Sequence, residues 1–246
     1  MEKLYAQWKK DEQTPFSGWD FSYIRNRLKV ENPPWGYRKE AKKLIKKATA
    51  VLDIGTGGGE VLPLLGPFPK HTFATESWLP NVPVARKKLG PLGIKVIKTD
   101  KSGKLPFVDK KFDLVLNRHS FYDEKEIFRV LKNGGKFLTQ QVDGDNLKDL
   151  ARGFGVKPQI KNWTLKIARN NLEKIGFKIE QAKEWSGNTE FKDVSAIVYS
   201  LKAIPWIVKG FSVDKYLPVL EKLQNKLNNG KRLIFITKRF LIKARK

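Results

Sequence analysis

The sequence predicts an α/β fold built on a mostly parallel sheet with helices on both faces. Short apolar runs alternate with amphipathic segments between residues 50 and 142, and the first of these runs ends in a glycine cluster. Strands that alternate with helices usually pair in parallel, because each helix returns the chain to the same edge of the sheet. The length of 246 residues suits one such domain with modest additions.

The first 36 residues are rich in tryptophan, proline and charge, with weak periodicity. We expect one or two short helices and a loop there, and interpret residues 1–36 as an N-terminal lid. Residues 37–48 are predicted to be a helix, because their apolar side chains share one face while lysines fill the other. The run at 50–54 is short and apolar and stops at glycine, which predicts a buried strand.

The alternation then continues to residue 142, with Gly134 and Gly135 marking a tight entry into its last strand. The expected elements, in chain order, are a helix at 60–65, a strand at 71–75, a helix at 81–89, strands at 94–98 and 112–116, a helix at 124–131 and a strand at 136–141.

Beyond residue 142 the alternation loosens. A polar connection at 143–158 is followed by a helix at 163–175, which Gly176 ends, and by a strand at 177–185. Two helices, at 193–203 and 213–227, precede a last strand at 233–237 that could continue through 240–242. We therefore expect a domain at 37–246 with a helical insertion at about 187–230, before its last strand.

Composition excludes several chemistries. The chain has no cysteine, which excludes disulfides, thiolate metal sites and a cysteine nucleophile of the kind that 5-methylcytosine formation needs. With only two histidines, we expect no metal site. No apolar run approaches the roughly 18 residues that span a bilayer, and the N-terminus lacks a signal-peptide pattern. We expect a cytoplasmic protein without a membrane partner.

The net charge of +24 allows two interpretations. A strongly positive field attracts polyanions such as RNA, whereas a lysine-rich surface can equally be solvated and inert. Residues 222–246 carry nine basic side chains and no acid. Together with the lysine face of 37–48, they could form an anion-binding surface.

The strongest motif is Asp53-Ile54-Gly55-Thr56-Gly57-Gly58-Gly59-Glu60, which follows the first predicted strand. A phosphate-binding loop would end in Gly-Lys-Ser/Thr, and Glu60 is a poor neighbour for a dinucleotide pyrophosphate. S-adenosylmethionine (SAM) carries a sulfonium and an ammonium group but no phosphate, so flanking acids are compatible with it. We therefore predict that this loop binds SAM through Asp53, Gly55, Thr56, Gly57 and Gly59.

Two further acids stand where such a ligand would need them. Glu76 ends the second strand and could accept hydrogen bonds from both ribose hydroxyls, and Trp78 could lie against the adenine. Asp100 follows the third strand and could accept the adenine amino group. The alternatives are a solvated loop acid for Glu76, simple packing for Trp78 and a turn-forming role for Asp100.

As a set these motifs resemble the class I SAM-dependent methyltransferases. The segment Arg129-Val130-Leu131-Lys132-Asn133-Gly134-Gly135 is typical of the type 11 methyltransferase domain, and that resemblance covers about residues 50–142. A wider resemblance, to a largely uncharacterised bacterial methyltransferase group, runs nearly end to end. Its shared pieces are Trp19-Asp20-Phe21, Pro33-Pro34-Trp35-x-Tyr37, Thr75-Glu76-x-Trp78-x-Pro80-Asn81, Asn117-Arg118-His119 and Thr139-Gln140-Gln141-Val142. The resemblance implies a Rossmann-like fold with a seven-stranded sheet, SAM as donor and an unspecified acceptor.

In this fold the acceptor lies beyond the fourth and fifth strands. Asn117, Arg118 and His119 end the fourth strand and are the catalytic candidates, and Asn117 is also a SAM candidate. His119 could act as a base or simply support the loop, and Arg118 could hold an acidic acceptor or pair with an internal acid. The candidates for binding the acceptor are Gln141, Asp143, Trp19 and Tyr23, with Phe21 beside the last two in the lid.

The segment Asn32-Pro33-Pro34-Trp35 resembles the site of amino-group methylases, but too few residues separate it from Asp53 for a strand and a helix. We therefore do not assign catalysis to it.

Four functions stay open. A methyltransferase acting on a small molecule is preferred, the alternatives being an RNA methyltransferase, a non-catalytic SAM-binding protein and, least favoured, a nicotinamide-dependent oxidoreductase.

Overall fold

The computed structural model describes residues 2–157 and 163–246. Within these residues, eight strands form one mixed sheet in the order β1-β7-β8-β6-β5-β2-β3-β4. The strands are β1 (Leu28–Val30), β2 (Ala50–Ile54), β3 (His71–Glu76), β4 (Lys95–Lys98), β5 (Phe112–Arg118), β6 (Leu131–Val142), β7 (Lys178–Phe191) and β8 (Leu233–Arg245). The helices are α1 (Glu2–Gln13), α2 (Tyr37–Ile45), α3 (Asn81–Leu89), α4 (Glu124–Val130), α5 (Lys148–Gly153), α6 (Leu165–Ile175), α7 (Val194–Ala203) and α8 (Val213–Asn228), with short 3-10 turns at Ser22–Ile24, Leu62–Leu65 and Gly90–Leu92.

Helices cover both faces of the sheet, as the sequence predicted. Strands β4, β3, β2, β5 and β6 pair in parallel, and all five residues of the central strand β2 are buried. Its alternate side chains serve opposite faces: Val51 packs in the core beneath α2 and α3, and Leu52 in the core beneath α4 and α6. The carboxyl ends of these parallel strands therefore meet at one edge, where open α/β sheets bind ligands.

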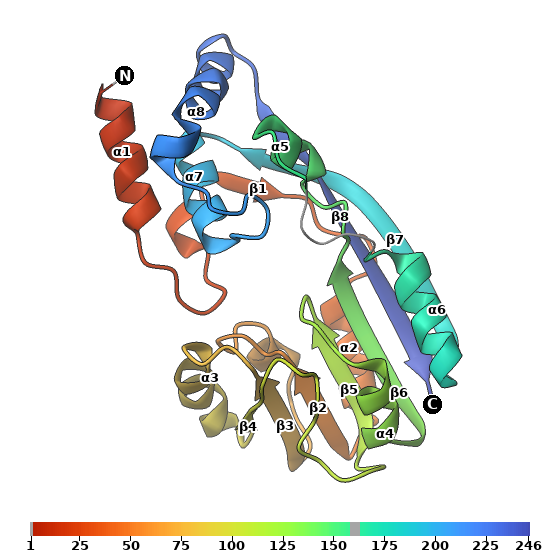
Figure 1. Cartoon of the computed structure of the whole chain (residues 1–246). Coiled ribbons are helices and arrows are strands. Elements are labelled where there is room, and N and C mark those ends of the chain that lie inside the picture. Colours follow the sequence, from red (N-terminus) through yellow and green to blue (C-terminus); the bar gives the residue numbers. More distant parts are fainter. Residues whose placement is uncertain (1, 158–162) are drawn as a thin grey trace.

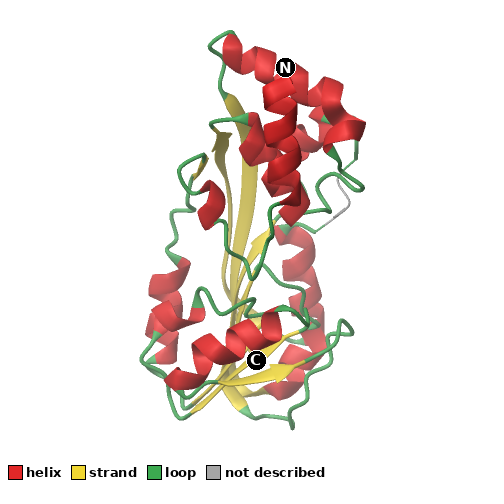
Figure 2. Cartoon of the chain, turned by 90° about the vertical axis from the view of Figure 1, so that its left-hand side faces the viewer, coloured by secondary structure: helices red, strands yellow, loops and turns green. Residues whose placement is uncertain are grey.

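Strands β7 and β8 are long and give the molecule its elongated shape (Figures 1 and 2). The C-terminal half of β8 pairs with β6, while its N-terminal half pairs only with β7 and extends beyond the parallel sheet. This extension supports an upper part made of α1, α5, α7 and α8, which has a hydrophobic core of its own around Trp8, Ile197 and Leu220. None of the described helices is long and apolar enough to cross a membrane.

The expected count of seven strands is wrong, because β1 adds an eighth at the edge. Leu28 pairs with Phe191 and Val30 with Thr189, antiparallel to β7. A strand of three residues with one paired side needs no apolar alternation, so the charged segment at 25–31 concealed it. Helix α1 packs against α7 and buries Trp8, and the lid role expected for residues 1–36 stays a prediction.

Several expected boundaries also change. The helix expected at 60–65 is only a 3-10 turn at Leu62–Leu65, because glycines precede it and the non-helical Gly66, followed by Pro67, ends it. The polar connection at 143–158 contains α5, and its last residue lies outside the described residues. Strand β6 begins at Leu131 and passes through Gly134, which has a φ of +77°. Strand β7 continues to Phe191, so the first residues of the expected insertion are strand.

Candidate active site

The glycine loop leaves β2 in a conformation that only glycine adopts easily. Gly55 has a φ of +69°, and a Cβ built there would lie 2.0 Å from the hydroxyl oxygen of Ser120. Gly57 has a φ of +65°, and its N–H donates a hydrogen bond of 2.7 Å to the carboxylate of Glu76. The second oxygen of Glu76 accepts from the N–H of Trp78, also at 2.7 Å. Glu76 thus joins the loops after β2 and β3, and each of its oxygens keeps a lone pair for a ribose hydroxyl.

Asp53 lies beneath this loop, buried at the end of β2. The pKa of its carboxyl is raised to about 7, mainly by burial and in part by the nearby Glu76, while the neighbouring Thr56 hydroxyl and the charge of Arg118 act in the opposite direction. A cationic ligand would relieve both effects by favouring the charged carboxylate. The hydroxyl of Thr56 is also buried, without a hydrogen-bond partner among the described residues. The loop therefore offers carboxylates and a hydroxyl without a hydrogen-bond partner. These groups fit SAM, which carries positive charge and no phosphate.

A cavity of about 320 Å³ opens beside Gly55 and is lined by Ser77, Thr99 and Asp100, among others. Asp100 accepts hydrogen bonds from the N–H and the hydroxyl of Ser102, at 2.8 and 2.5 Å, so it also shapes a turn. Trp78 is 57% exposed, with the Lys101 ammonium 5.8 Å from its ring centre. Asp53, Glu76 and Trp78 border the loop but do not line this cavity.

A second, larger cavity of about 720 Å³ lies between the parallel sheet and the upper part. Its wall includes Trp19 and Phe21 from the N-terminal segment and Trp206 from the connection between α7 and α8. The rings of Trp19 and Trp206 are stacked, with centroids 6.0 Å apart and planes inclined by 7°. Tyr23, expected to lie with them, does not line this cavity. Its hydroxyl donates to Asp11, and its ring packs on Tyr199.

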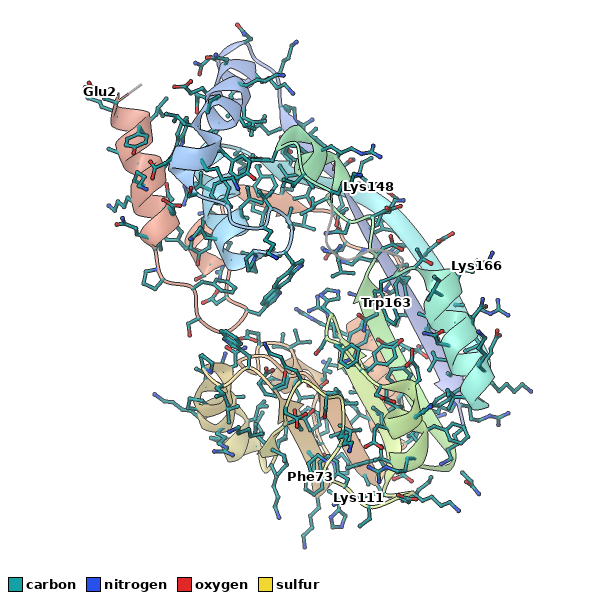
Figure 3. All side chains as sticks on the ribbon, viewed as in Figure 1. Glu2, Phe73, Lys111, Lys148, Trp163 and Lys166 are labelled. Carbon is teal, nitrogen blue, oxygen red and sulfur yellow. The ribbon has the colours of Figure 1, made fainter. Side chains whose placement is uncertain are left out.

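The two cavities share the segment Ser120–Tyr122, which follows β5. Trp163, labelled in Figure 3, contributes to the larger cavity and packs edgewise against Tyr122, with ring centroids 5.7 Å apart. The hydroxyl of Tyr122 is buried without a hydrogen-bond partner in the described chain.

His119 lines the larger cavity in an unusual backbone conformation, with a φ of +60°. Its Nε2 lies 2.9 Å from the side-chain amide nitrogen of Gln140. The side-chain oxygen of Gln140 accepts a hydrogen bond from the indole N–H of Trp35. Burial lowers the pKa of His119 well below its usual value, and the charges of Arg118 and Arg239 lower it further. These contacts favour the supporting role that the sequence left open, and the role of base stays a prediction.

Asn117 and Gln141 belong to a buried polar cluster. The amide nitrogen of Asn117 donates to the backbone oxygen of Ile54, and its oxygen accepts from Thr139 and Gln141. Gln141 also donates to the backbone oxygen of Ser120 at 3.2 Å. The cluster connects β2, β5 and β6 behind the glycine loop, and only Gln141 of the two amides reaches the larger cavity.

Arg118 and Asp143 both line the larger cavity, as does Arg239, which sequence reasoning missed. Asp143 accepts from the N–H of Asp145 at 2.9 Å, and burial raises the pKa of its carboxyl. The sequence did offer a signal for Arg239, because Lys238 and Arg239 stand between the apolar runs 233–236 and 240–242. Nothing in the local pattern pointed to Trp206.

Glu60 serves the N-terminal segment rather than the ligand side of the loop. Its carboxylate accepts a hydrogen bond of 3.3 Å from the N–H of Trp19 and lies 3.8 Å from the Lys88 ammonium. The segment that carries Trp19 is therefore fixed directly on the glycine loop.

Comparisons with known proteins agree with this geometry. Residues 52–139 match a family model described as a methyltransferase domain. The BH2331 protein of Bacillus halodurans is 21% identical, with a TM-score of 0.59 over 85% of this chain and 99% of its own. A functionally unknown protein from Deinococcus radiodurans is 14% identical, with a TM-score of 0.61 over 99% of this chain and 97% of its own.

An S-adenosylmethionine-dependent methyltransferase from Mesorhizobium loti is 15% identical, with a TM-score of 0.53 over 86% of this chain and 97% of its own. No curated protein matches the sequence. The solved structures establish the Rossmann-like methyltransferase fold, and the family match establishes the domain and its methyl donor. Residues 52–139 thus carry a methyltransferase domain, and this domain implies SAM-dependent methyltransferase activity.

Proposed function

We propose that the protein methylates a small organic molecule held in the larger cavity, with SAM bound at the glycine loop. The observation that carries this proposal is the segment Ser120–Tyr122, which lines both cavities. Methyl transfer is an in-line displacement, so the nucleophile must meet the methyl group on the side opposite the sulfur. A donor cavity that adjoins an acceptor cavity meets this requirement, and holding the two reactants in line supplies much of the acceleration.

The positions of three acids near the glycine loop support a role for each of them in binding SAM. Glu76 would accept the ribose hydroxyls, Asp53 would face the positive charge, and Asp100 would accept the adenine amino group. When bound, SAM supplies a methyl group that its sulfonium already activates. The chain's own task is then to position the two partners and exclude water, and the stacked Trp19 and Trp206 in the wall of the larger cavity would contribute to both.

A small molecule is favoured over RNA because the wall of the larger cavity is mainly aromatic and aliphatic. The basic C-terminal stretch also gives little support to an RNA surface, because several of its charges already have partners. Arg232 pairs with Glu190 at 2.5 Å and Lys243 with Glu40 at 3.0 Å, and the Lys246 ammonium donates to backbone oxygens. RNA stays the second candidate on the strength of the net charge of +24.

The test is incubation with methyl-tritiated SAM and three fractions of a cell extract: molecules below about 3 kDa, RNA and protein. We expect label in the small-molecule fraction, blocked by excess unlabelled SAM. Label that enters only RNA, and that ribonuclease releases, would favour the second candidate. No transfer to any fraction by protein that binds SAM would contradict both.

A further inference from the structure

Two arginines extend into the larger cavity from one face of the sheet. Arg118 is the last residue of β5 and pairs with Gln140, which in turn pairs with Leu241 on β8. Paired residues direct their side chains to the same face, and so do residues two apart on one strand. Arg239 stands two residues before Leu241, so its side chain shares the face of Arg118. Both arginines line the larger cavity.

Neither arginine has a carboxylate partner. The described residues include every aspartate and glutamate of the chain, and none lies within 4.0 Å of a guanidinium nitrogen of Arg118 or Arg239. Arg118 makes no side-chain hydrogen bond within the described chain. Arg239 donates to the side-chain oxygen of Asn146 and, at 2.8 Å, to the backbone oxygen of Lys238.

The surroundings make this pair of cations costly without an anion. Burial and, to a smaller extent, the charge of Arg118 together lower the pKa of Arg239 to about 10. Burial also lowers the pKa of Arg118. Both groups remain charged at neutral pH, so the cavity holds two cations whose repulsion an anion would relieve. Two acids, Glu124 and Asp143, also line the cavity, but neither pairs with these arginines. Glu124 accepts a hydrogen bond from the side chain of Asn171, and Asp143 accepts one from the N–H of Asp145.

We propose that the methyl acceptor carries an oxyanion, a carboxylate or a phosphate, that Arg118 and Arg239 bind, and an apolar body that packs against Trp19 and Trp206. This inference rests on the proposed function and names its substrate class. A planar guanidinium binds either oxyanion through two parallel hydrogen bonds. The aromatic and aliphatic residues that line the same cavity would then contact the rest of the molecule.

The test uses three probes with the same ring: 1-naphthoate, 1-naphthyl phosphate and the neutral 1-naphthalenemethanol. Their affinities are measured by calorimetry with the full chain saturated with S-adenosylhomocysteine. We expect at least one anion to bind about tenfold or more tightly than the alcohol, because charge-assisted hydrogen bonds are the stronger ones. Preference between the two anions identifies the group as carboxylate or phosphate.

Arg118→Met and Arg239→Met should each remove most of this preference and leave the affinity for the alcohol unchanged. Arg245→Met is the matched control, because Arg245 lies on β8 outside the cavity, and it should bind like the wild type. If either variant fails to fold, the affinities of the wild type for the three probes still show whether the cavity prefers an anion. Equal binding of anion and alcohol, or no binding of any probe, would overturn the inference.

Binding of SAM is measured on the same samples to separate the two proposals. Wild-type protein that does not bind SAM contradicts the proposed function itself. Protein that binds SAM but shows no preference for the anions contradicts only the assignment of the acceptor's charge.

Discussion

The indole N–H of Trp35 donates a hydrogen bond of 2.8 Å to the side-chain oxygen of Gln140. Because an indole only donates, this contact fixes which end of the Gln140 amide faces His119. The amide nitrogen then points to Nε2 of His119, which must accept, so the neutral ring carries its proton on Nδ1. A residue from the N-terminal segment thereby sets the tautomer of a histidine on the cavity wall.

The tautomer is testable because the chain has only two histidines, His119 and the exposed His71. In long-range ¹H–¹⁵N spectra, we expect His119 to show a single tautomer protonated on Nδ1 and no titration between pH 5.5 and 8, since its pKa is lowered well below the usual value. Trp35→Phe should release the amide and allow a second tautomer, while His71 stays unchanged as the internal control. A His119 that titrates normally in the wild type would contradict the arrangement.

The pKa of Asp53 makes stability depend on pH. Its folded value of about 7 lies above the value of about 3.9 in an unfolded chain, so the folded form binds more protons between them. This contribution is therefore present at low pH and lost as pH rises towards 7, by up to about 1.4 kcal/mol per pH unit. Urea unfolding of wild type and Asp53→Asn from pH 5 to 8 measures it. The stability of the wild type relative to the variant should fall with pH, and parallel profiles would refute the assignment.

The same carboxyl predicts how binding of SAM depends on pH. A cationic ligand favours the ionised form of Asp53, so the affinity of the wild type for SAM should increase from pH 6 to pH 8. In Asp53→Asn the increase should be smaller and the affinity at pH 8 weaker. Calorimetric titration at both pH values checks this, and a wild type that binds more tightly at pH 6 would exclude the proposed contact.

Two glycines with nearly the same φ form a matched pair for the loop. Gly55 has a φ of +69° with Ser120 against it, whereas Gly93 has a φ of +73° with open space around it. Alanine at either position costs backbone strain, of the order of 1 kcal/mol, but only Gly55→Ala also displaces Ser120. We expect Gly55→Ala to lose at least tenfold in affinity for SAM, and Gly93→Ala to bind as the wild type does. Equal losses would show that strain alone is responsible.

The stacked indoles of Trp19 and Trp206 should give an exciton couplet in far-ultraviolet circular dichroism. Trp19→Phe and Trp206→Phe should each abolish the couplet and cost about 0.5–1.5 kcal/mol of stability, the range for aromatic pairs. Trp78→Phe is the control, because Trp78 is exposed and stacks on no described ring. A couplet that survives both replacements, or that Trp78→Phe removes, would contradict the stacking.

Much of the fold was predictable because the parallel core repeats a local pattern. The apolar runs at 50–54 and 71–75 and the helix at 81–89 appear almost as expected, since each buries its own side chains against immediate neighbours. The extension of β7 beyond residue 185 was less visible, because residues 186–190 are polar or glycine and show no apolar alternation. Strand β1 forms its only strand pairing among the described residues with β7, so its own three residues did not predict it.

By itself, the sequence determined the order of the parallel strands β2 to β6 along the chain, the glycine loop and the acids around it, because these depend on local periodicity and on backbone conformations that glycine alone adopts. Only the tertiary structure decided which side chains meet across the larger cavity. Trp19 reaches Trp206, Trp35 reaches Gln140, and Arg118 and Arg239 share one wall. Residues so far apart in the chain are brought together by the pairing of β8 with β6 and by the packing of the upper part, and no local pattern encodes that register.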